Sequence, residues 1–151
     1  SATSLCIRGA SVDAAVACLV VEHIEDLDTA LGEAARVLRP GGTFLLVLNH
    51  PLLQTPGSGW IDDQVLDPPE QYWRVGPYLV EGDSVEQVDN GVHIRFFHRP
   101  LSRYLNTASD LGLSLVRMEE PPPPPGFLSQ SEEYTDAASI PRLLFLSFRR
   151  A

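Results

Sequence analysis

The sequence predicts an α/β domain built on a parallel sheet with helices on both faces. Three observations carry this prediction. The segment Val12–Val21 is almost continuously apolar and does not alternate, which is typical of a strand covered on both faces. An amphipathic helical stripe follows it. A second apolar strand, Thr43–Asn49, comes next, and strand, helix and strand in this order predict a right-handed βαβ unit.

The helical stripe lies between these two strands and has clear end signals. Asp26 is a natural N-cap, and the sequence Pro40-Gly41-Gly42 is expected to stop the helix before the second strand begins. Apolar residues recur there at three- and four-residue spacing: Leu27, Ala30, Leu31, Ala34, Val37 and Leu38.

The segment from His50 to Arg74 is interrupted by Pro and Gly, which predicts a long irregular connection rather than a regular element. Connections of this length usually carry function or are disordered. Beyond it, Ser84–Val88 and Val92–Phe97 flank an Asn-Gly pair, the strongest short signal for a β-hairpin.

The rest of the chain is predicted to close the fold. Pro100 opens a second amphipathic helix, and Gly112 ends it. Four segments follow in order: a strand at Leu113–Glu119, a stiff polyproline spacer at Pro121–Pro125, a polar stretch at Ser129–Ser139, and a last strand at Ile140–Phe148.

Composition narrows the classes of function. The 151 residues fit one domain, and the formal charge of -9 has no basic run to offset it, which argues against nucleic acid as a partner. Cys6 and Cys18 lack metal or disulfide spacing, so buried reduced thiols and a cytoplasmic location are expected. The longest apolar run, Ala14–Val21, is too short to span a bilayer, so no membrane partner is expected.

Three passages resemble one family. "SVDAAVACLVVEHIEDLDTALGEAARVLRPGGTFLLVLNHP" resembles the fourth strand, the following helix and the fifth strand of class I S-adenosylmethionine-dependent methyltransferases of the type 11-like group. "HRPLSRYLNTASDLGLSLVRMEEP" resembles their last helix and sixth strand, and "IPRLLFLSFRR" resembles their seventh. The resemblance implies a partial Rossmann-like fold in which the sheet strands follow the order 4-5-7-6 with flanking helices.

The resemblance also implies what these 151 residues lack. Members of the family have a glycine-rich loop after their first strand and an acidic residue after their second, and both grip the cofactor. Neither motif stands in this sequence. We therefore expect residues 1–151 to be the C-terminal part of one methyltransferase domain, with residues 50–98 as a variable acceptor-side loop and hairpin. The expected cofactor is S-adenosyl-L-methionine (SAM), and the expected partner is a small-molecule acceptor.

Candidate site residues follow from the resemblance and from the rule that open α/β sheets bind ligands beyond the carboxyl ends of their strands. The cofactor side is expected at Ala2, Thr3, Leu19, Val20 and His23. The substrate side is expected at Asn49, His50, Tyr72, Trp73 and His98, with the two aromatic residues in a mobile lid. The candidate catalytic bases are His50, His98 and His23.

Other roles remain open for several of these residues. His23 alternatively anchors its loop, His50 alternatively caps one, and Asp13 is expected to be structural. Tyr72 and Trp73 alternatively pack against their own hairpin. Arg99 is expected to pair with Glu119 or Glu120. The four His residues have no metal-ligand spacing, so no metal site is expected.

Two other interpretations compete with the methyltransferase. The chain is alternatively a non-catalytic interaction or dimerisation module with a degenerate half-fold, or the nucleotide-binding half of a dehydrogenase. The "LRPGG" passage and the terminal strand pair favour the methyltransferase over the dehydrogenase. With the strand order 4-5-7-6, the strand at Val12–Leu19 lies at an edge of the sheet, so self-association through that edge is expected.

Overall fold

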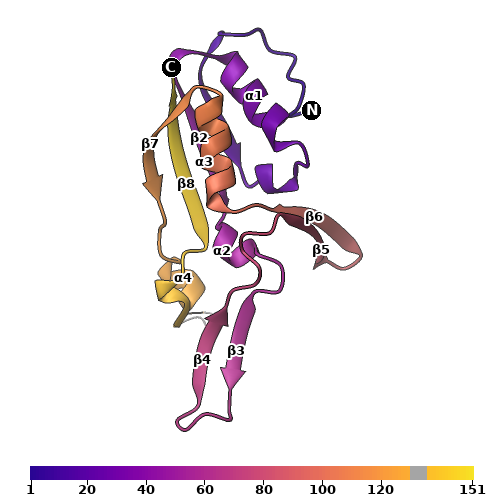
Figure 1. The fold of residues 1–151 in the computed structure, drawn as a ribbon, viewed down its shortest axis with the longest axis vertical. Coiled ribbons are helices and arrows are strands. Elements are labelled where there is room, and N and C mark those ends of the chain that lie inside the picture. The colour runs from indigo at the N-terminus through magenta and orange to yellow at the C-terminus, as the bar shows by residue number, and fades with distance from the viewer. Residues whose placement is uncertain (130–135) are drawn as a thin grey trace.

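A mixed four-stranded sheet forms the centre of the molecule (Figure 1). The computed structural model describes residues 1–129 and 136–151. Strands β1 and β2 are parallel, whereas β8 runs antiparallel to both of its neighbours, β2 and β7. The strand order is β1-β2-β8-β7, with bounds Val12–Cys18, Leu38–Asn49, Leu143–Arg150 and Leu113–Glu119 in that order.

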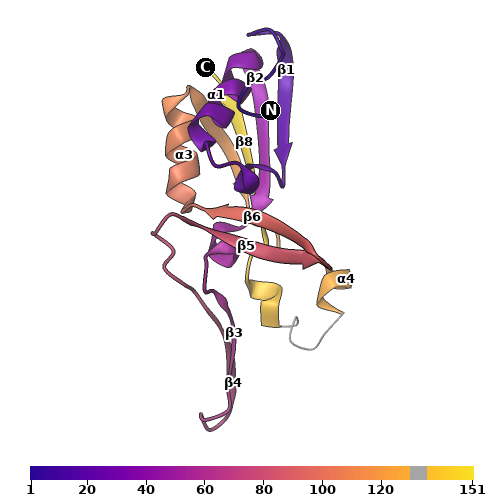
Figure 2. The ribbon, with the colours of Figure 1, turned by 90° about the vertical axis from the view of Figure 1, so that its right-hand side faces the viewer.

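Both long helices cover the same face of this sheet (Figures 1 and 2). Helix α1 spans Leu27–Val37, and helix α3 spans Leu101–Asp110. Their apolar stripes pack onto the inward side chains of the strands and form one core. Its buried members include Leu27, Leu31, Leu38, Phe44, Leu46, Leu48, Tyr104, Ala108, Leu113, Leu144, Leu146 and Phe148.

The helix-end signals at Asp26, Pro100 and Gly112 are confirmed. Asp26 caps α1, because its Oδ1 atom accepts a hydrogen bond of 3.0 Å from the Thr29 backbone N–H. Helix α3 begins directly after Pro100. Gly112 follows its end with a φ of 74°, a left-handed conformation that glycine adopts without steric cost.

The start of the second strand differs from the prediction. Strand β2 begins at Leu38, so Pro40-Gly41-Gly42 lies within the strand rather than between helix and strand. The register shift between Val12 and Ala14 accommodates this stretch, because Val12 pairs with Leu38 and Ala14 pairs with Thr43. A Cβ atom on Gly42 would lie 2.8 Å from the Arg39 carbonyl oxygen, so this irregular passage requires glycine there.

The prediction of an irregular connection from His50 to Arg74 is wrong. A short helix, α2 (Pro51–Gln54), is followed by an antiparallel hairpin of β3 (Gly59–Asp63) and β4 (Glu70–Arg74). This β3–β4 arm extends away from the central sheet (Figures 1 and 2). The second hairpin, predicted from Asn90-Gly91, is confirmed as β5 (Gly82–Asp89) and β6 (Val92–His98).

The C-terminal region keeps its predicted strands but shifts one boundary. The strand predicted at Leu113–Glu119 is confirmed as β7, whereas the last strand runs over Leu143–Arg150 rather than Ile140–Phe148. Helix α4 (Pro125–Leu128) takes up the end of the predicted polyproline spacer. The 3-10 turn η3 spans Asp136–Ser139, and the polar stretch predicted at Ser129–Ser139 lies partly outside the described residues.

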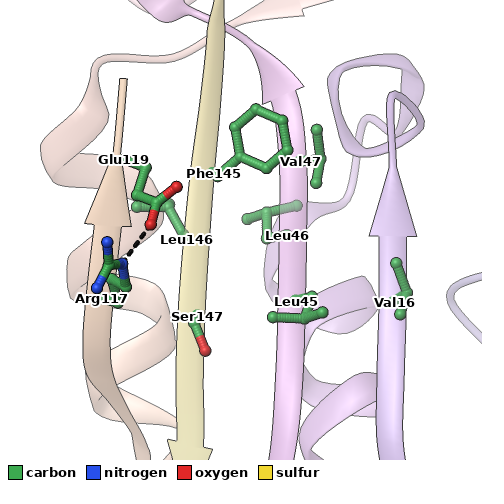
Figure 3. A pocket seen from close by; sticks show the side chains of 9 residues that line it. All are labelled: Val16, Leu45, Leu46, Val47, Arg117, Glu119, Phe145, Leu146 and Ser147. Carbon is green, nitrogen blue, oxygen red and sulfur yellow. Dashed lines mark hydrogen bonds and ion pairs between the residues drawn. The ribbon is translucent and has the colours of Figure 1, made fainter. Parts of the chain in front are cut away.

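The opposite face of the sheet is open, which corrects the expectation that helices cover both faces. Val16, Leu45 and Phe145 are 64%, 41% and 37% exposed, although all three lie on the strands of the central sheet. They line a groove of about 320 Å³. Arg117 and Glu119, which also line it, form an ion pair (Figure 3). Cys6 and Cys18 are also exposed rather than buried.

Candidate functional site

The carboxyl ends of β1 and β2 bring together two loops that the sequence singled out. The strands are parallel, and Cys18 pairs with Val47, so residues 19–23 and 49–51 meet at one edge of the sheet. The Leu19 backbone N–H donates to the Val47 carbonyl oxygen at 2.8 Å. Leu19 has a φ of 51°, which turns the chain sharply into the one-turn helix η1 (Val21–His23).

Glu22 joins these two loops, and sequence reasoning missed it. Its side chain is 2% exposed. Its Oε1 atom accepts hydrogen bonds from the Asn49 backbone N–H at 3.3 Å and from Asn49 Nδ2 at 3.0 Å. In the sequence Glu22 stands in an acidic cluster with Glu25, Asp26 and Asp28, next to the start of the predicted helix. The available signal was its position between the apolar Val20–Val21 pair and Ile24.

The three candidate catalytic histidines differ in what their ring nitrogens contact. His23 Nδ1 donates to the Arg95 carbonyl oxygen at 2.9 Å, and its ring packs edge-on against Phe96. These contacts anchor η1 to the β5–β6 hairpin.

His50 has both of its ring nitrogens engaged. Nδ1 accepts from the Leu52 backbone N–H at 3.1 Å and thereby caps α2, and Nε2 donates to Glu120 Oε1 at 2.8 Å. His50 therefore ties the start of α2 to the end of β7. The expectation that Glu120 pairs with Arg99 is not met, because Arg99 Nη2 donates instead to the carbonyl oxygens of Ile24 and Glu25, each at 2.7 Å.

His98 keeps one ring nitrogen unpartnered in a buried place. Its Nε2 atom donates to the Tyr78 carbonyl oxygen at 2.8 Å, which leaves Nδ1 as an acceptor in the neutral ring. Within the described part of the chain, His98 Nδ1, Glu22 Oε2 and Arg99 Nη1 are all buried without a hydrogen-bond partner. All three side chains line one small cavity, together with Asn49, Pro51, Gln54, Phe97 and Tyr104.

The electrostatics of this cavity are close to balanced. The Glu22 carboxylate and the Arg99 guanidinium are 2% and 5% exposed and bring one charge of each sign. Burial raises the pKa of the Tyr104 phenol, against the lowering effect of the nearby Arg99 charge. Tyr104 is therefore a neutral wall of the cavity at physiological pH.

Tyr72 and Trp73 lie on the β3–β4 arm rather than at the carboxyl ends of β1 and β2. Tyr72 is 44% exposed. Trp73 pairs with Trp60 across the hairpin, with ring centroids 5.6 Å apart in an edge-to-face arrangement. This aromatic pair holds the two strands of the arm together.

A second cavity, of about 170 Å³ and mostly apolar, lies on the other side of η1. Ala2, Val20 and Val21 line it together with residues of β1 and α1. Thr3 is not among its lining residues and bonds locally to Ser1 Oγ at 2.8 Å. Its mostly apolar walls offer few hydrogen-bonding partners, so the cavity suits a flat, largely apolar group.

The N-terminal segment is tied to α1 by one charged cluster. Glu33 Oε2 accepts from the Leu5 backbone N–H at 2.7 Å, and Arg36 bonds to Glu33 and to the carbonyl oxygens of Leu5 and Ile7. The Arg36 hydrogen bond, followed by the Leu5 N–H, lowers the pKa of the Glu33 carboxyl to about 2. This cluster positions Ala2 beside the apolar cavity.

We expect acidification to release this segment. The pKa of Glu33 in the folded chain lies below its ordinary value of 4.5, so the contact is complete above that value and is lost as the pH falls through about 2. The Leu5 amide resonance should therefore titrate with a midpoint near pH 2. Glu33→Gln should shift it at neutral pH, whereas Glu70→Gln on the β3–β4 arm should not. A midpoint near 4.5 would contradict the assignment.

Two further classes of site find no support in the described residues. No group of three or more His, Cys, Asp or Glu side chains among them is placed to hold a metal ion. Of the helices that the structure describes, none combines the length and apolar character that a membrane crossing requires.

Comparison with known proteins points to one enzyme class. Residues 1–46 match the family model described as a methyltransferase domain. An S-adenosylmethionine-dependent methyltransferase from Mesorhizobium loti is 26% identical over 99% of this chain and 67% of its own, with a TM-score of 0.80. A protein from Listeria monocytogenes, provisionally assigned the same activity, is 20% identical over 100% of this chain and 67% of its own, with a TM-score of 0.82.

A more distant structure is the 1,6-didemethyltoxoflavin-N1-methyltransferase of Burkholderia thailandensis, which is 12% identical over 99% of this chain and 48% of its own, with a TM-score of 0.53. No curated protein sequence matches the chain. The chain therefore has part of the Rossmann-like fold of class I SAM-dependent methyltransferases, and it spans about two thirds of the length of the first two structures.

Proposed function

We propose that this chain forms the acceptor side of a SAM-dependent methyltransferase that acts on a small molecule. The observation that carries the proposal is the likeness to the Mesorhizobium loti enzyme over 99% of the chain, together with the polar cavity at the carboxyl ends of β1 and β2. In this proposal β1, β2, β8 and β7 are the fourth, fifth, seventh and sixth strands of the class I fold. The Burkholderia thailandensis structure contains bound 1,6-didemethyltoxoflavin and S-adenosylhomocysteine, which is consistent with a small-molecule acceptor.

The helix η1 divides the proposed site into two sides. Val21 lines the apolar cavity, which we assign to the adenine of SAM, with Ala2 and Val20 in its wall. Thr3, Leu19 and His23 remain candidates at its border. Glu22, the next residue, lines the polar cavity, which we assign to the acceptor. SAM supplies an electrophilic methyl group when it is bound, and this chain positions the acceptor and excludes water.

Among the candidate bases, the contacts favour His98. The ring nitrogens of His50 already accept from Leu52 and donate to Glu120, so we assign His50 to positioning α2. His23 holds η1 against the β5–β6 hairpin through Nδ1. His98 lines the cavity, and its Nδ1 atom is buried without a hydrogen-bond partner. Tyr72 and Trp73 on the β3–β4 arm are proposed to cover an acceptor as a lid.

A chimaera tests this proposal. The N-terminal third of the Mesorhizobium loti enzyme would be joined to residues 1–151, and release of S-adenosylhomocysteine would be measured with pools of small acceptors. We expect turnover above the acceptor-free background and loss of most of it in His98→Gln, in which the new amide takes the place of Nε2 but not of Nδ1. The control is Glu70→Gln, which should leave turnover unchanged. A folded chimaera that binds SAM but transfers no methyl group would contradict the proposal.

A second candidate function is an interaction module, and one observation favours it. The sheet face opposite α1 and α3 is apolar and open, and β1 beside it is an edge strand. We propose that a second copy of the chain covers this surface. This role does not require catalysis, so it is tested separately, by the sedimentation experiment described in the Discussion.

A further inference from the structure

The polar side chains that line the cavity between η1 and the β6–α3 junction are buried, and three of their atoms lack a hydrogen-bond partner. Leaving a buried donor or acceptor unsatisfied is costly, so three such groups on one cavity indicate a place built for a polar ligand group. The three atoms are Glu22 Oε2, His98 Nδ1 and Arg99 Nη1. They come from both sides of the proposed acceptor site.

The size of the cavity limits what enters it. Its volume of about 10 Å³ admits one water-sized group. A carboxylate, phosphate or amide has too many heavy atoms for this space. The part of a ligand that enters is therefore a single heavy atom with its hydrogens, and the remainder of the ligand lies outside, where Pro51 and Phe97 provide apolar walls.

Two polar groups with a single heavy atom remain, an ammonium and a hydroxyl, and the hydrogen-bonding groups of the cavity walls distinguish them. The cavity is lined by the Glu22 carboxyl group and by the His98 ring, whose Nδ1 accepts when Nε2 carries the proton, and the Arg99 guanidinium N–H is a donor. An ammonium group has only donors, so it would leave Arg99 Nη1 unpaired and bring a second positive charge next to it. A hydroxyl donates one hydrogen bond and accepts another, and it adds no charge to a site in which Glu22 and Arg99 already balance.

We infer that this cavity binds the hydroxyl group of the methyl acceptor. The hydroxyl donates to Glu22 Oε2, with His98 Nδ1 as the adjacent acceptor, and it receives a hydrogen bond from Arg99 Nη1. Asn49 fixes the carboxylate, because its two N–H groups hold Oε1 and leave Oε2 for the ligand. The inference rests on the proposed function, and it narrows the acceptor to a hydroxyl compound.

Four probes that share one ring test the inference on the 151-residue chain without any cofactor. Phenol, benzylamine, benzoate and toluene present a hydroxyl, a cation, an anion and no polar group. The readouts are the Glu22 carboxyl ¹³C and His98 ring ¹⁵N resonances. Phenol is expected to shift both, and the other three probes are expected to shift neither.

Variants then assign the effect to the cavity. Glu22→Gln places an amide N–H₂ at the acceptor position and should weaken phenol binding by about tenfold. Glu70→Gln, which removes an exposed carboxylate from the β3–β4 arm, should bind phenol like the unchanged chain. The amide spectrum of each variant verifies its fold, and the His98 ring resonances remain a readout in Glu22→Gln.

Three outcomes would each overturn the inference. They are that phenol shifts neither resonance, that benzylamine or benzoate binds as tightly as phenol, or that Glu22→Gln binds phenol with unchanged affinity. These outcomes are separate from the chimaera experiment. A chimaera that transfers methyl groups while phenol fails to bind would remove the hydroxyl site and keep the methyltransferase. Phenol binding without methyl transfer by the chimaera would do the reverse.

Discussion

Residues 1–151 alone are expected to bind SAM at least about a hundredfold more weakly than the chimaera with the N-terminal third of the Mesorhizobium loti enzyme. The cavity lined by Ala2, Val20 and Val21 is mostly apolar and suits an adenine ring. The ribose and the charged amino-acid end need hydrogen-bonding partners that this cavity does not provide. Each missing hydrogen bond to a charged group weakens binding by about 1.5–3 kcal/mol, so the loss of two reaches a hundredfold.

Calorimetric titration of SAM into both proteins measures this difference. S-adenosylhomocysteine serves as a matched ligand, because it keeps the adenine, the ribose and the amino-acid end but lacks the sulfonium charge. Both ligands should bind the chimaera and fail to saturate the 151-residue chain. Micromolar affinity of the chain alone for SAM would show that its own residues hold the polar ends of the cofactor.

The elements that sequence reasoning predicted well are those whose determinants are local. The cap at Asp26, the helix stop at Gly112 and the turn at Asn90-Gly91 each depend on a few neighbouring residues, and all three hold. The β3–β4 arm was missed for the complementary reason. Its strands are held together by cross-strand pairs such as Trp60 with Trp73, which are not neighbours in the sequence. The Pro and Gly residues of the same segment indicate a loop instead.

The candidate site was predictable in its place but not in its chemistry. Parallel strands end at one edge, so the loops after β1 and β2 were found from the strand pattern alone. Burial of Glu22 depends on contacts with Asn49 and on packing around the β6–α3 junction, and no local pattern reports it. The partner of Arg99 was mispredicted similarly, because backbone carbonyls of Ile24 and Glu25, rather than an acidic side chain, receive its hydrogen bonds.

Burial on β1 shows how composition alone misleads. A continuous apolar run predicts a strand covered on both faces. In the structure the side chains of Ala15 and Ala17 pack against the core, whereas Val16 and Cys18 are exposed on the other face. The apolar run indicates that both faces of this strand are suited to contact other apolar groups. The described residues cover only one of these two faces. A surface of this kind favours association with a further layer of protein.

The chain is expected to self-associate through this surface, most simply as a twofold dimer. Among the described residues, strand β1 pairs with β2 alone, so its other side carries backbone groups without a strand partner there. The Leu19 N–H faces β2, and by strand alternation the N–H of Val16 faces the free edge. The strand contains no Pro, and Asp13 is its only charged residue, so it lacks the usual features that block edge pairing.

Val16→Lys should break this association. The lysine would put a charge on both the free edge and the apolar groove that Val16 lines, and burying it against a second copy would raise the dissociation constant by about tenfold or more. The fold should tolerate it, because Val16 is 64% exposed.

Val65→Lys is the matched control, since Val65 is 93% exposed and lies beyond β3, away from the groove. Sedimentation velocity at micromolar concentration should give dimers for the unchanged chain and for Val65→Lys, and monomers for Val16→Lys. A monomeric unchanged chain would contradict the dimer. A Val16→Lys variant that still dimerises would show that the contact lies elsewhere.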